Sequence, residues 1–360
     1  MKLYAPALIT MLVMTFIVGG IIYSSRGDPL ALAQVGTRFL EGDSTGTQGY
    51  DGQFCYFIAL YPNPRVVQRY LDVPAYRFQR ILLPLLVRLI SFGNERLIPW
   101  IFPIISILAQ GIGTWFLSIL LHLWNKSYWY ALPYGLWAGF SLAIRLDLPE
   151  ALAFGLVICA ILAFEKKHEF IGCVFFGMAL FAKEVTILFV VAALIAIIYQ
   201  KKWHTLLLLL VFSLIPYIAF QLWLRIIFGS FGIGSGGMMA TPFEIIPLMG
   251  FFRIGYYSLF YMLMMLIVFL PSVIGPAIWG LSASVRRLAL LNFDNITISL
   301  FLNSLIIFFL PFSTFRETGG LLRMSCGLVL AVILFLAKFN QDRLLKYSFF
   351  WIVYNAFLLK

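Results

Sequence analysis

Residues 3–23 read LYAPALITMLVMTFIVGGIIY, a run that contains no charged side chain. An α-helix of about 20 apolar residues crosses the roughly 30 Å hydrocarbon core of a bilayer. A signal peptide is the alternative, with Lys2 as its basic flank and Ala31-Leu32-Ala33 as its cleavage site. The run is too long for the apolar core of a signal peptide, and the small residues lie too far beyond it. We therefore expect an uncleaved membrane span.

Comparable apolar runs recur along the chain, in which 62% of the 360 residues are apolar and only 11% are charged. Few water-soluble folds can bury so much apolar surface. Lipid offers no partner for backbone N–H and C=O groups, so the spans must be helices. The sequence predicts an all-α integral membrane protein, a single polytopic domain over residues 1–360, with about eleven crossings. After the first, the expected crossings are residues 97–123, 128–144, 149–165, 169–183, 184–200, 205–228, 256–281, 296–313, 324–339 and 345–359.

Residues 24–96 form a long segment between the first two expected spans, and its first part is polar. A connection of this length inside a compact domain is unusual and is often functional. Residues 81–92 are apolar but too short to cross, and Pro84 and Arg88 interrupt them. We expect a juxtamembrane helix that lies along the membrane surface.

Basic residues in the short turns give the orientation, because they alternate with the other set of turns. By the positive-inside rule the basic turns are cytoplasmic, which places the N-terminus inside and residues 24–96 outside a cytoplasmic (inner) membrane. The formal charge of +11 is then orientation charge and not a nucleic-acid surface. The basic residues of these turns are Lys2, Lys126, Lys166, Lys167, Lys201, Lys202, Arg286, Arg287, Lys338, Arg343 and Lys346.

The opposite turns carry acids and bases together, which orientation does not require. Ionisable residues at membrane depth are costly and indicate a site or a pathway. Arginine is frequent among them, and its planar guanidinium binds phosphate through two parallel hydrogen bonds. The sequence therefore predicts an outward-facing cavity that binds a phosphate. These outer residues are Arg145, Asp147, Glu150, Lys183, Glu184, Arg253, Arg316, Glu317 and Arg323.

The sharpest local pattern is GYDGQFCY at residues 49–56, just beyond the first span. Glycines allow the backbone to bend tightly there, and the aromatic faces of Tyr50 and Tyr56 suit a sugar ring. Asp51, with Gln53 nearby, is a candidate general base that takes a proton from an attacking hydroxyl. The alternative is an aspartate that only stabilises a turn through its own backbone.

Three further patterns admit both structural and functional interpretations. Arg77 and Arg80, next to Tyr76, share one helix face and either hold a phosphate or extend toward lipid headgroups. Asp147 and Glu150 flank Pro149 as pocket residues or as a helix-capping box. Lys183 and Glu184 either pair with each other or meet a charged substrate.

Gly232-Ile233-Gly234-Ser235-Gly236-Gly237 matches the dinucleotide fingerprint in form, but no predicted strand precedes it. We interpret it as a flexible loop that rearranges over substrate. The four cysteines have no metal-ligand spacing, and Cys55 alone is expected to face an aqueous loop. We predict neither a metal site nor a cofactor, while a divalent cation remains an open possibility.

The architecture and two of these motifs resemble the polytopic glycosyltransferases of the GT-C superfamily, which use polyprenyl-phosphate-linked sugars. Residues 49–56 followed by 76–84 are similar to the first-loop signature of bacterial mannosyltransferase-like members. The Lys183-Glu184 turn and the segment from Arg316 to Arg323 resemble their counterparts more weakly. The family's better-known eukaryotic members often have a paired acid, whereas Gly52 follows Asp51 here, which leaves one base and weakens the case for a metal.

This resemblance implies an inverting hexosyl or pentosyl transfer on the outer face. The hydroxyl of a glycan, lipid or protein acceptor attacks the anomeric carbon of the polyprenyl-phosphate-sugar donor, and a lipid phosphate leaves. Asp51 takes the position of the base. Two alternatives stay open: a flippase or transporter of lipid-linked sugar, for which we find no internal repeat, and a surface polysaccharide polymerase or ligase, for which we expect a larger later loop. The implied phosphate-binding residues are Arg77, Arg80, Lys183, Arg316 and Arg323.

Overall fold

The computed structural model describes residues 2–358, and its regular structure in that range is helical throughout, without a strand. The prediction of an all-α chain is confirmed. Five helical runs within this range are long and apolar enough to cross a membrane. They are Ala5–Ser24, Ile98–Leu123, Trp203–Phe228, Leu259–Ala289 and Thr318–Lys338.

Two of the five runs are single α-helices, and the others have a joint. Because π-helical turns carry one extra residue, they change the direction in which the next turns face. The runs consist of α1 (Ala5–Ser24); α7 (Ile98–Leu123); α13 (Trp203–Leu209) and α14 (Ile215–Phe228), joined by the π-helical turn Leu210–Leu214; α16 (Leu259–Phe269) and α17 (Gly275–Ala289), joined by the π-helical turn Leu270–Ile274; and α20 (Thr318–Met324) with α21 (Cys326–Lys338).

The joint between α16 and α17 contains Pro271, which has no N–H to donate. Two aromatic side chains of the C-terminal segment donate hydrogen bonds to carbonyls beside it. The Trp351 indole N–H lies 3.0 Å from the Ser272 carbonyl oxygen, and the Tyr354 hydroxyl lies 2.6 Å from that of Val268. These bonds satisfy backbone oxygens that lipid would leave without a partner.

Several apolar helices are shorter than the ~20 residues that cross a bilayer unaided. The count of about eleven crossings therefore remains a prediction. These helices are α10 (Glu150–Glu165), α11 (Glu169–Ala182), α12 (Ile187–Tyr199, preceded by the 3-10 turn Glu184–Thr186) and α18 (Asn295–Phe308).

The prediction of one continuous helix over residues 128–144 is wrong. This stretch is divided into the 3-10 turn Tyr128–Ala131, α8 (Leu132–Gly135) and α9 (Ala138–Ile144). Trp137 has extended backbone between the last two and is fully buried, with its indole N–H 3.0 Å from the Leu322 carbonyl oxygen. The C-terminal stretch also differs from a long α-helix, since it consists of α22 (Asp342–Tyr347) and the 3-10 helix Ser348–Leu358.

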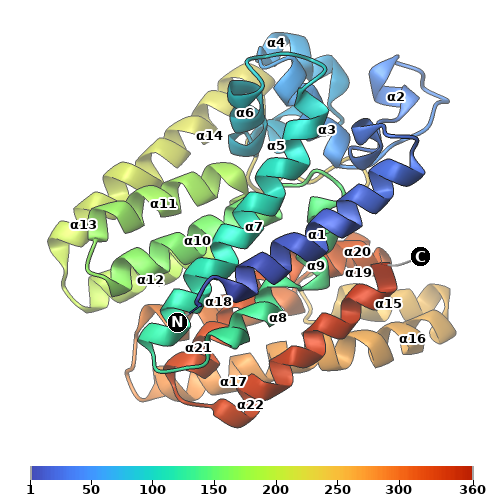
Figure 1. Cartoon of the computed structure of the whole chain (residues 1–360). Helices are drawn as coiled ribbons and strands as arrows, with labels where there is room; N and C mark the ends of the chain where they lie inside the picture. The colour runs from blue at the N-terminus through green and yellow to red at the C-terminus, as the bar shows by residue number, and fades with distance from the viewer. Residues whose placement is uncertain (1, 359–360) are drawn as a thin grey trace.

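Residues 24–96 fold into short helices that gather over one end of the long ones (Figure 1). Arg88 of α6 joins two of these helices, because its guanidinium donates to the carbonyls of Ala59 and Leu60 at the end of α3, at 2.9 and 3.0 Å. The elements are the 3-10 turn Pro29–Leu32, α2 (Thr37–Leu40), α3 (Gly52–Leu60), α4 (Pro64–Val67), the 3-10 turn Gln68–Tyr70, α5 (Pro74–Phe78) and α6 (Leu82–Ile90). Two further short helices, α15 (Met249–Tyr257) and α19 (Phe312–Arg316), lie later in the chain.

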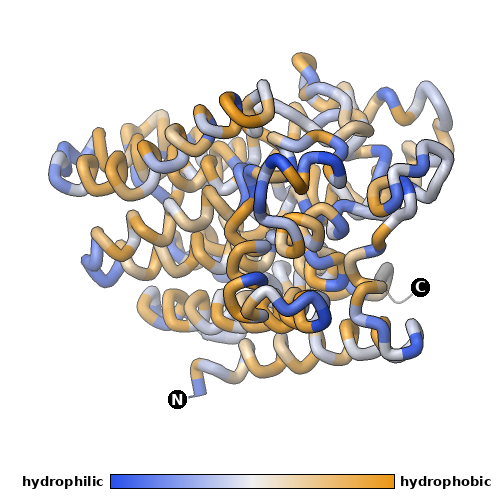
Figure 2. The backbone as a smooth tube through the Cα atoms, turned by 90° about the horizontal axis from the view of Figure 1, so that it is seen from above, coloured by the Kyte–Doolittle hydropathy of each residue, from blue (hydrophilic) through white to orange (hydrophobic). Residues whose placement is uncertain are grey.

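The basic turns meet at the other end of the bundle. Lys126 pairs with Asp342 at 2.6 Å, and Lys338 pairs with Glu165. In Figure 2 the helices are mostly hydrophobic along their length, while hydrophilic stretches gather at the turns and connections. The bundle therefore has two polar ends, one with the basic turns and one with the 24–96 segment.

Small residues let the central helices pack closely. A Cβ on Gly113 of α7 would lie 3.0 Å from the Cα of Gly155 of α10. A Cβ on Gly139 of α9 would lie only 2.1 Å from the Leu322 carbonyl oxygen of α20. The second contact is between backbones, so no side-chain rotation can relieve it.

We expect Gly139→Ala to destabilise the protein by about 1–3 kcal/mol, because α9 and α20 must separate to admit the methyl group. Gly19→Ala is the matched control, since a Cβ at Gly19 meets nothing within 4 Å in α1. Thermal unfolding of both variants in the same detergent measures the difference. Equal midpoints for the two variants would contradict the tight contact.

Candidate functional site

A polar cavity of about 260 Å³ opens where four segments from distant parts of the chain meet. It is lined by residues of the 48–54 turn, of the 72–77 stretch, of 237–240 at the end of the Gly-rich stretch, and of 313–324. The structure thus brings together eight of the residues that the sequence indicated. They are Tyr50, Asp51, Gln53, Tyr76, Arg77, Arg316, Glu317 and Arg323.

Asp51 occupies the position just before α3, and its backbone is fixed by its neighbours. Gly49 has a φ of +66°, in the left-handed region that favours glycine. A Cβ on Gly52 would lie 2.1 Å from the Leu146 carbonyl oxygen, so the first turn of α3 rests directly on that backbone. The Asp51 side chain makes no capping hydrogen bond to its own helix, which argues against the turn-stabilising alternative.

The Gln53 side chain stabilises the turn before Asp51 through two hydrogen bonds to backbone groups. Its side-chain oxygen accepts from the Gly36 N–H at 3.1 Å, and its amide nitrogen donates to the Gln48 carbonyl at 2.8 Å. The side chain is 1% exposed. Gln53 therefore supports the loop that carries Asp51 instead of reaching toward a substrate.

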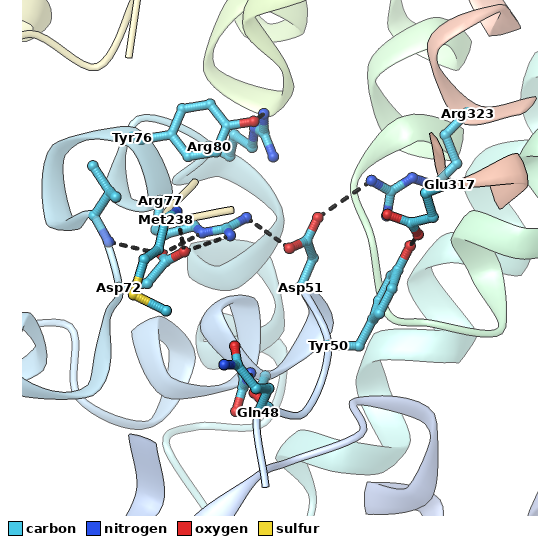
Figure 3. Close-up of polar contacts among 12 residues, drawn as sticks. Gln48, Tyr50, Asp51, Asp72, Tyr76, Arg77, Arg80, Met238, Glu317 and Arg323 are labelled. Atoms are coloured by element: carbon cyan, nitrogen blue, oxygen red, sulfur yellow. Dashed lines mark hydrogen bonds and ion pairs between the residues drawn. The ribbon is translucent and has the colours of Figure 1, made fainter. Parts of the chain in front are cut away.

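The Asp51 carboxylate lies between two arginines (Figure 3). Oδ1 is 2.9 Å from Arg77 Nη1, and Oδ2 is 3.2 Å from Arg323 Nη2. Burial opposes ionisation, but Arg77 and Arg323 outweigh it and hold the pKa of Asp51 well below its usual range. The carboxylate is therefore ionised, and each of its two oxygens lies next to a guanidinium group.

Arg77 is itself held by Asp72, a residue that the sequence analysis did not single out. Arg77 Nε and Nη2 donate to the two Asp72 oxygens at 2.7 and 2.8 Å, and the Phe54 ring lies 4.3 Å from the guanidinium carbon. Burial opposes ionisation of Asp72 as well, yet Arg77 lowers its pKa. The available signal was an acid five residues before Arg77, at the start of the short helix that carries it.

Arg323 connects Asp51 to a deeper ion pair. Its Nε lies 3.6 Å from Glu150 Oε1, and the same oxygen is 2.6 Å from Lys183 Nζ. The Glu150 and Lys183 side chains are 1% and 4% exposed, so this pair is sealed from solvent. Removing one partner of such a pair leaves an uncompensated buried charge.

Arg80 belongs to a separate pair. Its Nε lies 2.8 Å from Glu184 Oε2, and its Nη2 donates to the Tyr76 hydroxyl at 2.6 Å. Arg77 and Arg80 are each only 8% exposed, so neither extends toward lipid headgroups. Lys183 and Glu184 also take different partners, which excludes the alternative that they pair with each other.

These pairs distinguish Arg316 from the other predicted phosphate-binding residues. Arg77, Arg80, Lys183 and Arg323 each face a carboxylate. Arg316 is exposed, lines the cavity and forms no ion pair with any side chain in the described range. An anion that enters the cavity meets Arg316 without having to displace a carboxylate.

The Tyr50 hydroxyl donates to Glu317, and this pair lies between the polar cavity and a second one. The second cavity, of about 490 Å³, is lined by Tyr50 and Glu317 on one side and by apolar residues of α16 on the other. Arg145, a predicted pocket residue, lines this second cavity instead of the first. The two cavities thus share one hydrogen-bonded wall.

Four predicted pocket residues lie outside both cavities: Tyr56, Asp147 and the ion-paired Glu150 and Glu184. Tyr56 is half-buried on α3 and tilts against Phe57. Asp147 is 1% exposed, has a φ of +53°, and neither carboxylate oxygen has a hydrogen-bond partner among the described residues. Pro149 is the N-cap of α10, which has no side-chain cap, so Asp147 does not form the predicted capping box. Burial raises the pKa of Asp147 well above its usual value.

All four cysteines are buried, so the prediction that Cys55 faces an aqueous loop is wrong. Cys55 belongs to the main buried apolar cluster, which also contains Leu83 and Val87 of α6. Within residues 2–358 no cluster of three or more His, Cys, Asp or Glu side chains is arranged to hold a metal ion. The cavity presents arginines opposite its carboxylates, which suits an anion.

The sequence matches no protein-family model, and comparison with curated proteins and with solved structures found no match. The geometry of the cavity and the motif resemblance are therefore the two indications of function.

We expect Asp147→Asn to stabilise the protein at about pH 8 by on the order of 1–3 kcal/mol and to have little effect near pH 4. The folded carboxyl keeps its proton while the unfolded carboxyl ionises, so native stability falls as pH rises through the raised folded pKa. Asparagine has the same shape, tolerates positive φ and carries no proton to lose.

Thermal midpoints across this pH range check the prediction, with Asp342→Asn as the control. Asp342 belongs to an exposed ion pair, whose loss changes stability little. A pH dependence that is the same in Asp147→Asn and in the native protein would contradict a buried, protonated Asp147.

Proposed function

We propose that this protein is an inverting glycosyltransferase that moves a sugar from a polyprenyl-phosphate-linked donor to an acceptor hydroxyl on the extracytoplasmic face of a cytoplasmic membrane. One observation carries the proposal. An ionised carboxylate, Asp51, faces a cavity at one end of a bundle of apolar helices, with Arg316 available for an anion in the same cavity.

The chemistry assigns complementary roles to these groups. The acceptor hydroxyl attacks the anomeric carbon as the bond from that carbon to the phosphate oxygen breaks. Asp51 takes the hydroxyl proton as a general base. The electron pair of the broken bond stays on the leaving lipid phosphate, and the charge that develops there is the one that arginine stabilises best. Arg316 lines the same cavity and forms no ion pair with a side chain of the described residues.

The resting contacts of Asp51 imply an order of binding. A carboxylate engaged by Arg77 and Arg323 is a weak base, because its protonation loses both charged hydrogen bonds. A donor phosphate competes for the same guanidinium groups and raises the pKa of Asp51 as it draws them away. The donor then binds before the acceptor hydroxyl is activated.

The second cavity supports a lipid donor. Its lining combines apolar residues with Tyr50, Glu317 and Arg145, and Tyr50 and Glu317 also line the Asp51 cavity. A charged headgroup linked to a long apolar chain matches this combination of polar and apolar lining. The apolar lining from α16 comprises Met264, Met265, Val268 and Phe269.

The flippase alternative receives less support from the arrangement of charges. The residues around Asp51 come from connecting segments and helix starts, at one end of the bundle. Arg77, Arg80, Lys183 and Arg323 each pair with a carboxylate at that end. Substrate paths in transporters are expected near the middle of the membrane instead.

Asp51→Asn is expected to lower the transfer rate by about 10²–10⁴-fold, since asparagine cannot accept the hydroxyl proton. The measurement is release of polyprenyl phosphate in proteoliposomes that contain a mixture of polyprenyl-phosphate sugars, at equal folded yield. Asp43→Asn is the matched control, because Asp43 is exposed in the same segment and bonds only within its own turn. Donor that crosses the bilayer without being consumed, in both native and variant protein, would replace the transferase proposal with the flippase.

Arg316→Gln is expected to weaken donor binding by about 10–100-fold, the value of a lost charged hydrogen bond. Arg253→Gln serves as the control, because Arg253 is exposed, pairs with Glu244 and does not line the cavity. Titration of a fluorescent polyprenyl-phosphate analogue gives both dissociation constants. Equal affinity in the two variants would exclude Arg316 from the phosphate site.

A further inference from the structure

Asp72 is a buried carboxylate whose acceptor capacity is fully used, in the turn just before α5. Its Oδ1 accepts from Arg77 Nε and from the Val73 N–H, both at 2.7 Å. Its Oδ2 accepts from Arg77 Nη2 at 2.8 Å and from the Met238 N–H at 3.0 Å. An ionised carboxylate offers about four acceptor sites, so these four donors saturate it. The side chain is 5% exposed.

The first consequence of these bonds is the orientation of Arg77. The guanidinium is planar, and its Nε and Nη2 edge is bound to Asp72. The remaining nitrogen, Nη1, therefore points at Asp51 Oδ1, 2.9 Å away. Figure 3 shows Arg77 lying between the two carboxylates. Asp72 thus restricts Arg77 to a single contact with Asp51.

The second consequence concerns the connection between α14 and α15, whose residues 237–240 line the cavity. This connection is anchored on one side by Gln221, whose side-chain oxygen accepts from Gly232 and Ile233 N–H at 3.0 Å. On the other side Thr241 and Ser313 exchange backbone-to-hydroxyl hydrogen bonds. Between these anchors the Met238 N–H reaches Asp72.

Gly237 brings the same segment directly onto Arg77. A Cβ at this position would lie 2.6 Å from Arg77 Nη2 and 3.3 Å from Asp72 Oδ2. Residues 237–240 and Arg77 line the same cavity. A side chain at residue 237 would therefore separate this segment from the Arg77 guanidinium.

We propose that Asp72 is a positioning residue that makes the alignment of Arg77 on Asp51 and the closure of residues 237–240 over the cavity a single event. The inference rests on the proposed function only for its catalytic consequence. Without the Asp72 charge, Arg77 is free to turn its Nε and Nη2 edge toward Asp51. Residues 237–240 also lose the hydrogen bond from the Met238 N–H to Asp72. Both changes disturb the base that the transfer reaction uses.

A purely structural role is the competing explanation, in which Asp72 only starts α5 through the Val73 N–H. Asp72→Asn separates the two roles. The asparagine oxygen still accepts a backbone N–H, but the side chain has no charge and its amide faces Arg77 with a donor. Helix initiation survives in this variant while the hold on Arg77 does not.

The test is hydrogen exchange of the backbone amides of residues 237–240. The Met238 side chain is exposed, but its backbone N–H is held by Asp72, so exchange reports directly on this bond. We expect deuterium to enter this segment about tenfold faster in Asp72→Asn, the effect of losing a charged hydrogen bond. Asp43→Asn is expected to change the rate less than about twofold. An unchanged rate in folded Asp72→Asn protein overturns the proposal.

Gly237→Ala provides a second route that leaves every charge in place. Its methyl group meets Arg77 and Asp72 and pushes them apart from residues 237–240, so exchange in this segment is expected to rise to a similar extent. An unchanged rate in this folded variant also overturns the proposal. Hydrogen exchange uses no donor, so its outcome does not depend on whether the protein transfers sugar.

Turnover then tests the catalytic consequence. Asp72→Asn is expected to lower kcat by about tenfold or more while the KM for donor changes less than about threefold, because the base is misaligned. A raised KM with unchanged kcat contradicts a positioning role. If the native protein consumes no donor while hydrogen exchange behaves as expected, the proposed function fails and the positioning role of Asp72 stands.

Discussion

The bridge from Arg77 through Asp51 to Arg323 depends on a balance of charge in a region with little water. Each arginine meets a second carboxylate, Asp72 or Glu150, so that neither guanidinium is left without compensation. Burial alone would drive Asp51 toward its neutral form, and the two arginines reverse that tendency. The cavity keeps an ionised base at one end of an apolar bundle because the surrounding charges are paired.

This constraint links segments that are far apart in the sequence. The carboxylates and cations around Asp51 come from the 24–96 segment, from the start of α10, and from α20. Lys183 extends the same set to the end of α11 through its 2.6 Å contact with Glu150. Loss of one member of the buried Glu150–Lys183 pair leaves its partner with an uncompensated charge, at a cost of about 3–5 kcal/mol.

Much of this arrangement was predictable from the sequence, and the exceptions have physical causes. Apolar runs predicted the helices because lipid forces backbone groups to pair within a segment. The clustering of acids and arginines in alternate turns predicted that residues such as Asp51, Arg77 and Arg323 lie near one another. Apolar composition did not predict the break at residues 128–144, because it arises where α8 ends at Gly135 and Trp137 takes an extended backbone to insert into the core.

A single sequence could not predict which carboxylate pairs with which basic side chain. Lys183 and Glu184 are adjacent, yet each pairs with a residue from another segment, because their side chains leave the chain in different directions. The sequence did not predict the role of Asp72, because one of its partners is the backbone N–H of Met238, which is 166 positions away. Such contacts are set by tertiary packing, and local patterns carry no record of them.

The joint between α16 and α17 gives the second cavity a mechanical property. Met264, Met265, Val268 and Phe269 line that cavity, and the π-helical turn with Pro271 follows them directly. Helices bend most readily where the regular ladder of hydrogen bonds is interrupted. The Trp351 and Tyr354 side chains brace this joint from the C-terminal segment. The wall of the cavity is thus the arm of a helix that leads into this joint, so a bend there would move the wall, and the two contacts that brace the joint come from residues 79 and 86 positions later in the chain.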